Sequence, residues 1–178
     1  MTTLFARVLG AEKFGVLAER VRGLHEATQQ RVYHGCADIE RGRGWLAGFC
    51  CRCAALPPTT TQQTVSVEIA PSASGECWTR RFGSHVMRSD LDDIDGCLRE
   101  RLGLLEFHFA LDAADGVLTW RVIRVRALGF LPLPAAWFSG VRASEAQRDG
   151  RYTFDVRAAL PVVGLLVHYR GWLDVEQT

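Results

Sequence analysis

Residues 106–125 read EFHFALDAADGVLTWRVIRV, and this stretch decides the fold. Apolar side chains from Phe107 to Leu111 alternate with polar ones, and a second alternating run follows the pair Asp115-Gly116. Alternation with a period of two is typical of a strand that buries one face, and Asp-Gly between two such runs is a strong hairpin signal. The stretch therefore predicts two antiparallel strands joined by a tight turn.

The same alternation continues in both directions along the chain. A second Asp-Gly pair, Asp149-Gly150, precedes two further alternating runs, and the apolar phase shifts at Ile123, which indicates a β-bulge. The polar stretch Ser89–Gly96 is predicted to be a turn. The other predicted strands cover residues 33–40, 64–69, 78–88, 152–158 and 165–173.

Helical spacing marks the first thirty residues. Phe14, Leu17, Val21 and Leu24 recur on one helical face, and Gly10 separates this helix from an earlier helical turn. Two shorter helices are predicted near residues 45–56 and 135–141, the first of them ended by a pair of prolines.

These elements predict one domain over residues 1–178, with a helical segment at 1–30 and mainly antiparallel strands at 31–178. The fold class is mainly β (α+β), and about seven strands form a curled antiparallel meander sheet, either a barrel or a half-barrel. Because such a sheet has to cover one face, the N-terminal helices are expected to pack across it.

Composition excludes several function classes. The 178 residues hold 21 basic and 20 acidic side chains, and a net charge of +1 gives no broad electrostatic footprint for nucleic acid. The longest apolar run, residues 160–167, is too short to span a membrane, and the first ten residues lack a secretory signal. We therefore expect a cytoplasmic protein without a membrane span.

No cofactor or metal is predicted. Nucleotide-binding glycine loops are absent, and the acidic run that ends at Asp95 does not match a calcium loop. Cys50, Cys51 and Cys53 lie close together, but no second close pair completes a zinc site. The six cysteines are interpreted as reduced thiols.

Enzyme motifs are absent too. The chain has no G-x-S-x-G elbow, and the sequence alone does not bring any of its five histidines to a serine or cysteine nucleophile. The sequence therefore leans against catalysis without deciding the question.

The last block of the chain is distinctive. It runs from Gly150-Arg151-Tyr152-Thr153-Phe154 through Leu160-Pro161 to the stretch Gly164–Leu173, which reads GLLVHYRGWL. This block resembles a bacterial family of domains of unknown function, number 4166, and the segment Trp78–Gly83 is similar to it as well. Some members follow an NAD(P)-binding domain similar to saccharopine dehydrogenase, which implies an accessory role beside an oxidoreductase.

Polar residues on the last two predicted strands suggest a binding site. If these strands pair antiparallel, Asp155, Arg157, His168 and Arg170 lie on one face, either as a solvent-exposed network or as the polar floor of a barrel mouth. The tryptophans Trp120, Trp137 and Trp172 either form aromatic walls of that mouth or belong to the core.

Three functions are consistent with these observations. The first is the binding of an apolar or amphipathic small molecule in the curled sheet. The alternatives are an interaction domain of an oxidoreductase and an unrecognised enzyme.

Overall fold

Three short helices begin the chain in the computed structural model, which describes residues 2–175. They are α1 (Leu4–Leu9), α2 (Ala11–Gly15) and α3 (Glu19–His25), so helices are present at the N-terminus as expected. The single helix expected from Phe14 to Leu24 is instead two helices, because the chain leaves the helix between Gly15 and Glu19. Gly10 separates α1 from α2, and its φ of 78° is a conformation that glycine adopts without steric cost.

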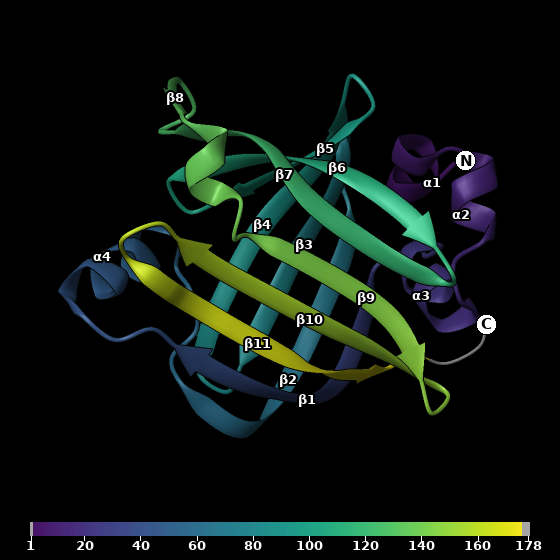
Figure 1. The fold of residues 1–178 in the computed structure, drawn as a ribbon. Helices are drawn as coiled ribbons and strands as arrows, with labels where there is room; N and C mark the ends of the chain where they lie inside the picture. Colours follow the sequence, from purple (N-terminus) through teal and green to yellow (C-terminus); the bar gives the residue numbers. More distant parts are fainter. Residues whose placement is uncertain (1, 176–178) are drawn as a thin grey trace.

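Eleven strands form one antiparallel sheet in the described part of the chain (Figure 1). They are β1 (Arg31–Arg41), β2 (Thr60–Pro71), β3 (Gly75–Phe82), β4 (His85–Ile94), β5 (Cys97–Leu102), β6 (Leu105–Ala114), β7 (Val117–Ala127), β8 (Leu131–Leu133), β9 (Arg142–Arg148), β10 (Arg151–Leu160) and β11 (Gly164–Asp174).

The sheet closes into a barrel of ten strands. Its order is β6-β5-β4-β3-β2-β1-β11-β10-β9-β7, and β6 also pairs with β7, which completes the ring. The eleventh strand, β8, pairs with β7 beyond the part of β7 that pairs with β9. Closure leaves no long unpaired strand edge on the ring.

The expectation of about seven strands in a barrel or half-barrel is therefore corrected to a closed barrel of ten strands plus β8. Four places account for the difference: the predicted strand at 78–88 is two strands, β3 and β4, and β5, β8 and β9 lie where no strand was predicted. The segment Ser89–Gly96 is mostly strand β4 rather than a turn, and the predicted strand at 78–88 is broken by a turn at Gly83. Polar residues are accommodated in β4 because Asp92, although buried, pairs with Arg99 on β5.

Tight turns connect the hairpins where Asp-Gly pairs occur. Asp115 and Gly116 have φ angles of 52° and 80°, and the pair at 149–150 is similar. Both central residues of a type I′ turn need a positive φ, which explains the sequence preference. A third pair, Asp95-Gly96, forms the β4–β5 turn.

The predicted bulge at Ile123 is confirmed. In the β6–β7 pairing, His108 lies opposite Arg124 while Phe109 lies opposite Val122, so Ile123 has no partner residue. The extra residue moves the apolar phase of β7 by one position.

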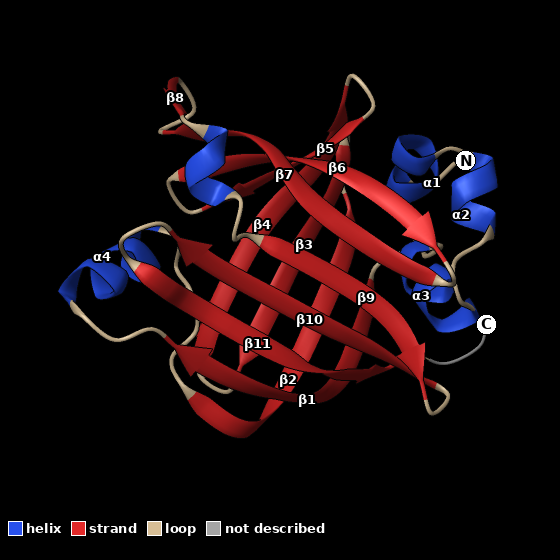
Figure 2. Ribbon diagram, in the orientation of Figure 1, coloured by secondary structure: helices blue, strands red, loops and turns tan. Residues whose placement is uncertain are grey.

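Helices lie at the two ends of the barrel (Figure 2). Helices α1–α3 lie at the end where the Asp-Gly turns connect the strands. Helix α4 (Trp45–Cys53) and the 3-10 helix η1 (Ala135–Phe138) lie at the opposite end, which we call the open end. No helix in residues 2–175 is long and apolar enough to cross a lipid bilayer.

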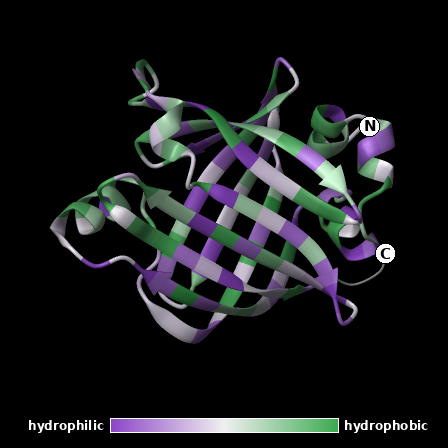
Figure 3. Cartoon of the chain, viewed as in Figure 1, coloured by the Kyte–Doolittle hydropathy of each residue, from purple (hydrophilic) through white to green (hydrophobic). Residues whose placement is uncertain are grey.

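Hydrophobic and hydrophilic residues alternate along the strands of the barrel wall (Figure 3). Strand β11 illustrates this, because Val167 and Leu173 are buried while Arg170 is exposed. The interior-facing residues of all ten strands form the core.

Candidate ligand-binding cavity

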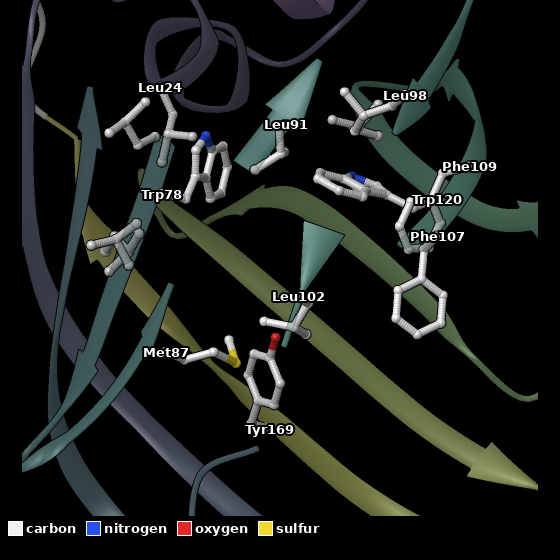
Figure 4. Close-up of a cluster of buried hydrophobic side chains, with 14 of the residues drawn as sticks. Leu24, Trp78, Met87, Leu91, Leu98, Leu102, Phe107, Phe109, Trp120 and Tyr169 are labelled. Atoms are coloured by element: carbon white, nitrogen blue, oxygen red, sulfur yellow. The ribbon is translucent and has the colours of Figure 1, made fainter. Parts of the chain in front are cut away.

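A cavity of about 390 Å³ lies inside the barrel. Its wall is mostly apolar and comes from every strand of the ring except β1, for example from Val65, Met87, Leu102, Phe107 and Phe154. Figure 4 shows Met87, Leu102 and Tyr169 projecting from different strands toward the same interior. A volume in this range fits one small organic molecule.

The N-terminal helices pack behind the wall residues Trp78 and Trp120 at one end of the cavity, which we call the floor. The centroid of the Phe5 ring on α1 lies 5.5 Å from the ring centroid of Trp120 and 6.0 Å from that of Trp78. Both tryptophans line the cavity. Leu24 on α3 is also buried next to this cluster (Figure 4). Aromatic packing of this kind seals one end of the barrel.

The cavity opens at the other end, between α4 and η1. Phe49 on α4 and Trp137 on η1 both line the cavity, yet they are 63% and 54% exposed to solvent. Two side chains that face both the lumen and the solvent define a mouth.

A buried ion pair lies in the cavity wall. Nη1 of Arg80 donates to Oε1 of Glu100 at 3.3 Å and to Oγ of Ser89 at 2.8 Å, and the guanidinium lies 4.7 Å from the centroid of Trp78. Arg80 and Glu100 both line the cavity. The pairing of the two groups offsets part of the cost of burying them.

A second polar group is centred on Glu145. Its Oε2 lies 2.6 Å from Nε2 of His25, and both side chains are almost fully buried. Glu145 and Tyr152 line the cavity, whereas His25 stacks against Phe5 at 3.7 Å in the floor. The carboxylate of Glu145 is thus held between the floor and the lumen.

Two tyrosines place hydroxyl groups in the wall. Burial, followed by the charge of Glu145, holds the pKa of Tyr152 well above its usual range. Burial raises the pKa of Tyr169 to about 12. Both hydroxyls therefore stay protonated near neutral pH and can donate hydrogen bonds. In addition, Nε1 of Trp120 is buried without a hydrogen-bond partner among the described residues.

Glu76 lies close to this floor, where its Oε2 accepts a hydrogen bond from Nε1 of Trp78 at 2.8 Å. Burial raises the pKa of Glu76, although the bond from Trp78 opposes the shift. The folded state therefore holds the Glu76 proton more tightly than the unfolded state does. The stability that this group contributes is present at low pH and is lost as pH rises through the folded-state pKa.

A Glu76→Gln variant is accordingly expected to be more stable than the wild type at about pH 7, and the difference should shrink toward about pH 4. Glutamine keeps an acceptor for Trp78 and removes the buried charge. Urea unfolding at several pH values measures this. A stability difference that does not change with pH contradicts the assignment.

The seven predicted site residues fall into two groups. Trp120 and Trp137 line the cavity. The other five lie on the outer face of β10 and β11, because the inward positions of these strands are taken by residues such as Val156 and Tyr169. The five outer residues are Asp155, Arg157, His168, Arg170 and Trp172.

The outer residues do come together as the antiparallel pairing predicts. Asp155 lies opposite Arg170 and Arg157 opposite His168, and the Asp155 carboxylate is 3.0 Å from Nε2 of His168. A polar floor in the barrel mouth does not fit this placement.

Sequence reasoning missed the polar groups that do line the cavity. A signal for them was present, since Arg80 shares the strand phase of Trp78 and Phe82, and Glu100 shares that of Leu98 and Leu102. A charged side chain in the apolar phase of a strand points into the core.

Metal ligands do not cluster in the described residues, where no group of three or more His, Cys, Asp or Glu could hold an ion. All six cysteines are free thiols, and Cys50 and Cys53 line the cavity near its mouth. Burial, followed by the neighbouring thiols, raises the pKa of Cys50, so this side chain is a neutral thiol near neutral pH.

Comparison with known proteins identifies the family of the chain. The model of a family described as "Domain of unknown function (DUF4166)" matches residues 17–173, which is nearly the whole barrel together with α3. No curated protein matches the chain.

Proposed function

The chain belongs to the DUF4166 family of domains of unknown function, and we propose that its barrel binds one apolar or amphipathic small molecule inside the lumen. The observation that carries this proposal is the cavity of about 390 Å³, sealed at one end and open at the other. Ligand sites are typically mostly apolar cavities of this size with a few polar groups that fix orientation.

The polar groups of the wall indicate which ligand chemistry is favoured. The charge of Arg80 is already matched by Glu100, so an ionised ligand group would leave one charge without a partner. The hydroxyl of Tyr169 in the cavity wall offers a hydrogen-bond donor instead. We infer an apolar body with an uncharged acceptor group, such as a hydroxyl, carbonyl or ester.

The first test is native mass spectrometry of the purified protein, followed by solvent extraction. A retained apolar molecule of defined mass supports the proposal. Titration with the neutral fluorescent probe N-phenyl-1-naphthylamine then measures the affinity of the cavity, with Trp120 in the wall as an energy-transfer donor.

An Ala143→Phe variant is expected to weaken probe binding by about tenfold or more, equivalent to about 1.4 kcal/mol. Ala143 lines the cavity, so the added ring occupies space that a ligand needs. The matched control is Ser144→Phe, because Ser144 is the next residue on β9 and alternation turns its side chain to the outer face. Equal affinities for Ala143→Phe and the wild type argue against binding in the lumen.

An accessory role beside an oxidoreductase stays a prediction from the fusion pattern of similar proteins. Co-purification with a dehydrogenase from the native host is the measurement that bears on it.

A further inference from the structure

The open end of the barrel has a rim that consists of five connecting segments: residues 41–60, 82–85, 102–105, 126–142 and 159–164. Among the described residues, thirteen large hydrophobic side chains are exposed, and nine of them lie in this rim. The nine include all four of the exposed aromatic residues, Trp45, Phe49, Phe130 and Trp137. Large exposed apolar patches mark interaction surfaces.

Charge is also distributed unevenly between the two ends of the barrel. The rim has no acidic residue, although the chain as a whole is nearly neutral. Its five basic residues are Arg41, Arg43, Arg52, Arg126 and Arg142, of which Arg126 is paired with Glu106 next to the rim at 3.6 Å. The turns at the opposite end contain Asp95, Asp115 and Asp149 instead. The rim therefore combines exposed aromatic side chains with a local positive charge.

We propose that the rim docks on the surface of an anionic phospholipid bilayer, with the cavity mouth facing the lipid. Docked in this way, an apolar ligand passes between the bilayer and the cavity without crossing water. The transfer step rests on the ligand binding proposed above, whereas docking itself does not.

Several features favour a bilayer over a protein partner. Tryptophan side chains are enriched at the membrane interface, where the indole contacts both headgroups and acyl chains. Arginine pairs with phosphate groups through two parallel hydrogen bonds. The exposed residues come from α4, the β7–β9 connection and two other segments around the mouth, with Trp45 81% and Phe130 74% exposed. A fluid lipid surface adapts to such a discontinuous ring.

The test is co-sedimentation of the full chain with vesicles. Wild-type protein is expected to bind vesicles of phosphatidylcholine with about a third phosphatidylglycerol and to bind pure phosphatidylcholine much less. Arg43→Gln and Arg52→Gln are each expected to weaken binding to the mixed vesicles about fivefold. Raising the salt concentration should weaken it further.

Matched controls come from the opposite end of the barrel. Arg31→Gln and Arg148→Gln change the net charge equally, at exposed positions outside the rim, and should leave vesicle binding within about twofold of wild type. The double variant Trp45→Ala with Phe130→Ala should also lose most vesicle binding. Its control is Val32→Ala, at an exposed apolar position outside the rim, which should keep vesicle binding.

Ligand binding is measured separately with N-phenyl-1-naphthylamine in the absence of vesicles. Trp45 and Phe130 do not line the cavity, so their variants should bind the probe like the wild type. Absence of vesicle binding, or equal losses from substitutions at both ends, overturns the docking proposal even if the probe binds. Vesicle binding without probe binding supports docking and overturns the proposed lumen site.

Discussion

A Gly171→Ala substitution is expected to destabilise the protein by about 3 kcal/mol. Gly171 lies on β11 opposite Ala37 of β1 and opposite Phe154 of β10. A Cβ atom at this position would lie 2.1 Å from the carbonyl oxygen of Cys36 and 2.9 Å from the Cα of Ala37. These are backbone atoms, so a side-chain rotation cannot relieve the overlap.

The consequence extends beyond one contact, because β1 and β11 join the two ends of the chain. Their pairing brings residues near 35 together with residues near 173, and no local turn holds them. If β1 and β11 are forced apart, the ring opens between them and both strands expose a free edge.

The matched control is Gly48→Ala in α4, where a Cβ atom meets nothing within 4 Å. This variant is expected to leave stability unchanged or to raise it slightly, since alanine favours the helix. Chemical denaturation of both variants gives the comparison. If the free energy of unfolding of Gly171→Ala lies within about 0.5 kcal/mol of the wild-type value, β1 and β11 accommodate the added Cβ atom at little cost, and the prediction is wrong.

An Arg80→Met substitution is expected to cost about 3 kcal/mol of stability because it leaves the Glu100 carboxylate buried without its partner. Both side chains are only 11% exposed. The bond to Ser89 is lost as well, and the aromatic face of Trp78 loses its cation.

The double variant Arg80→Met with Glu100→Leu should recover most of that loss. Replacing a buried ion pair by apolar side chains of similar volume is often neutral, whereas removing one partner is not. The exposed pair Arg22–Glu26 on α3 is the control, since Arg22→Met should cost at most about 0.5 kcal/mol. If the losses of stability from Arg80→Met and from Glu100→Leu simply add in the double variant, the two charges do not stabilise each other.

The Gly171→Ala variant tests whether the ring of strands can close. The Arg80→Met variant tests which side chains the interior of the closed barrel tolerates. Because both charged side chains line the cavity, the double variant also tests the ligand chemistry. A fully apolar wall at this position should favour ligands without a polar group.

Local patterns in the sequence predicted much of the secondary structure. Asp115-Gly116 and Asp149-Gly150 form the turns that the sequence indicates, and the phase shift at Ile123 is a bulge. Hairpins and bulges are determined by neighbouring residues, so a short window contains the information. The family resemblance is likewise confirmed by the match over residues 17–173.

Closure of the barrel was decided only by the tertiary structure. Alternation of apolar and polar residues predicts that a strand has a buried and an exposed face. It predicts neither the number of strands in the ring nor the pairing of β1 with β11. The polar strand β9 and the polar half of β4 lack the apolar alternation that marks a strand, so both were missed.

The cavity and the rim also depend on the closed ring. The outer face of β10 and β11 carries the predicted polar cluster around Asp155, while Arg80 and Glu100 lie inside. The near-zero net charge does not reveal that the rim has basic side chains and no acidic ones. The physical reason is the same in each case, because closure of the barrel brings together residues that are far apart in the chain. Closure therefore decides whether a residue lies in the lumen, on the outer face or at an end of the barrel.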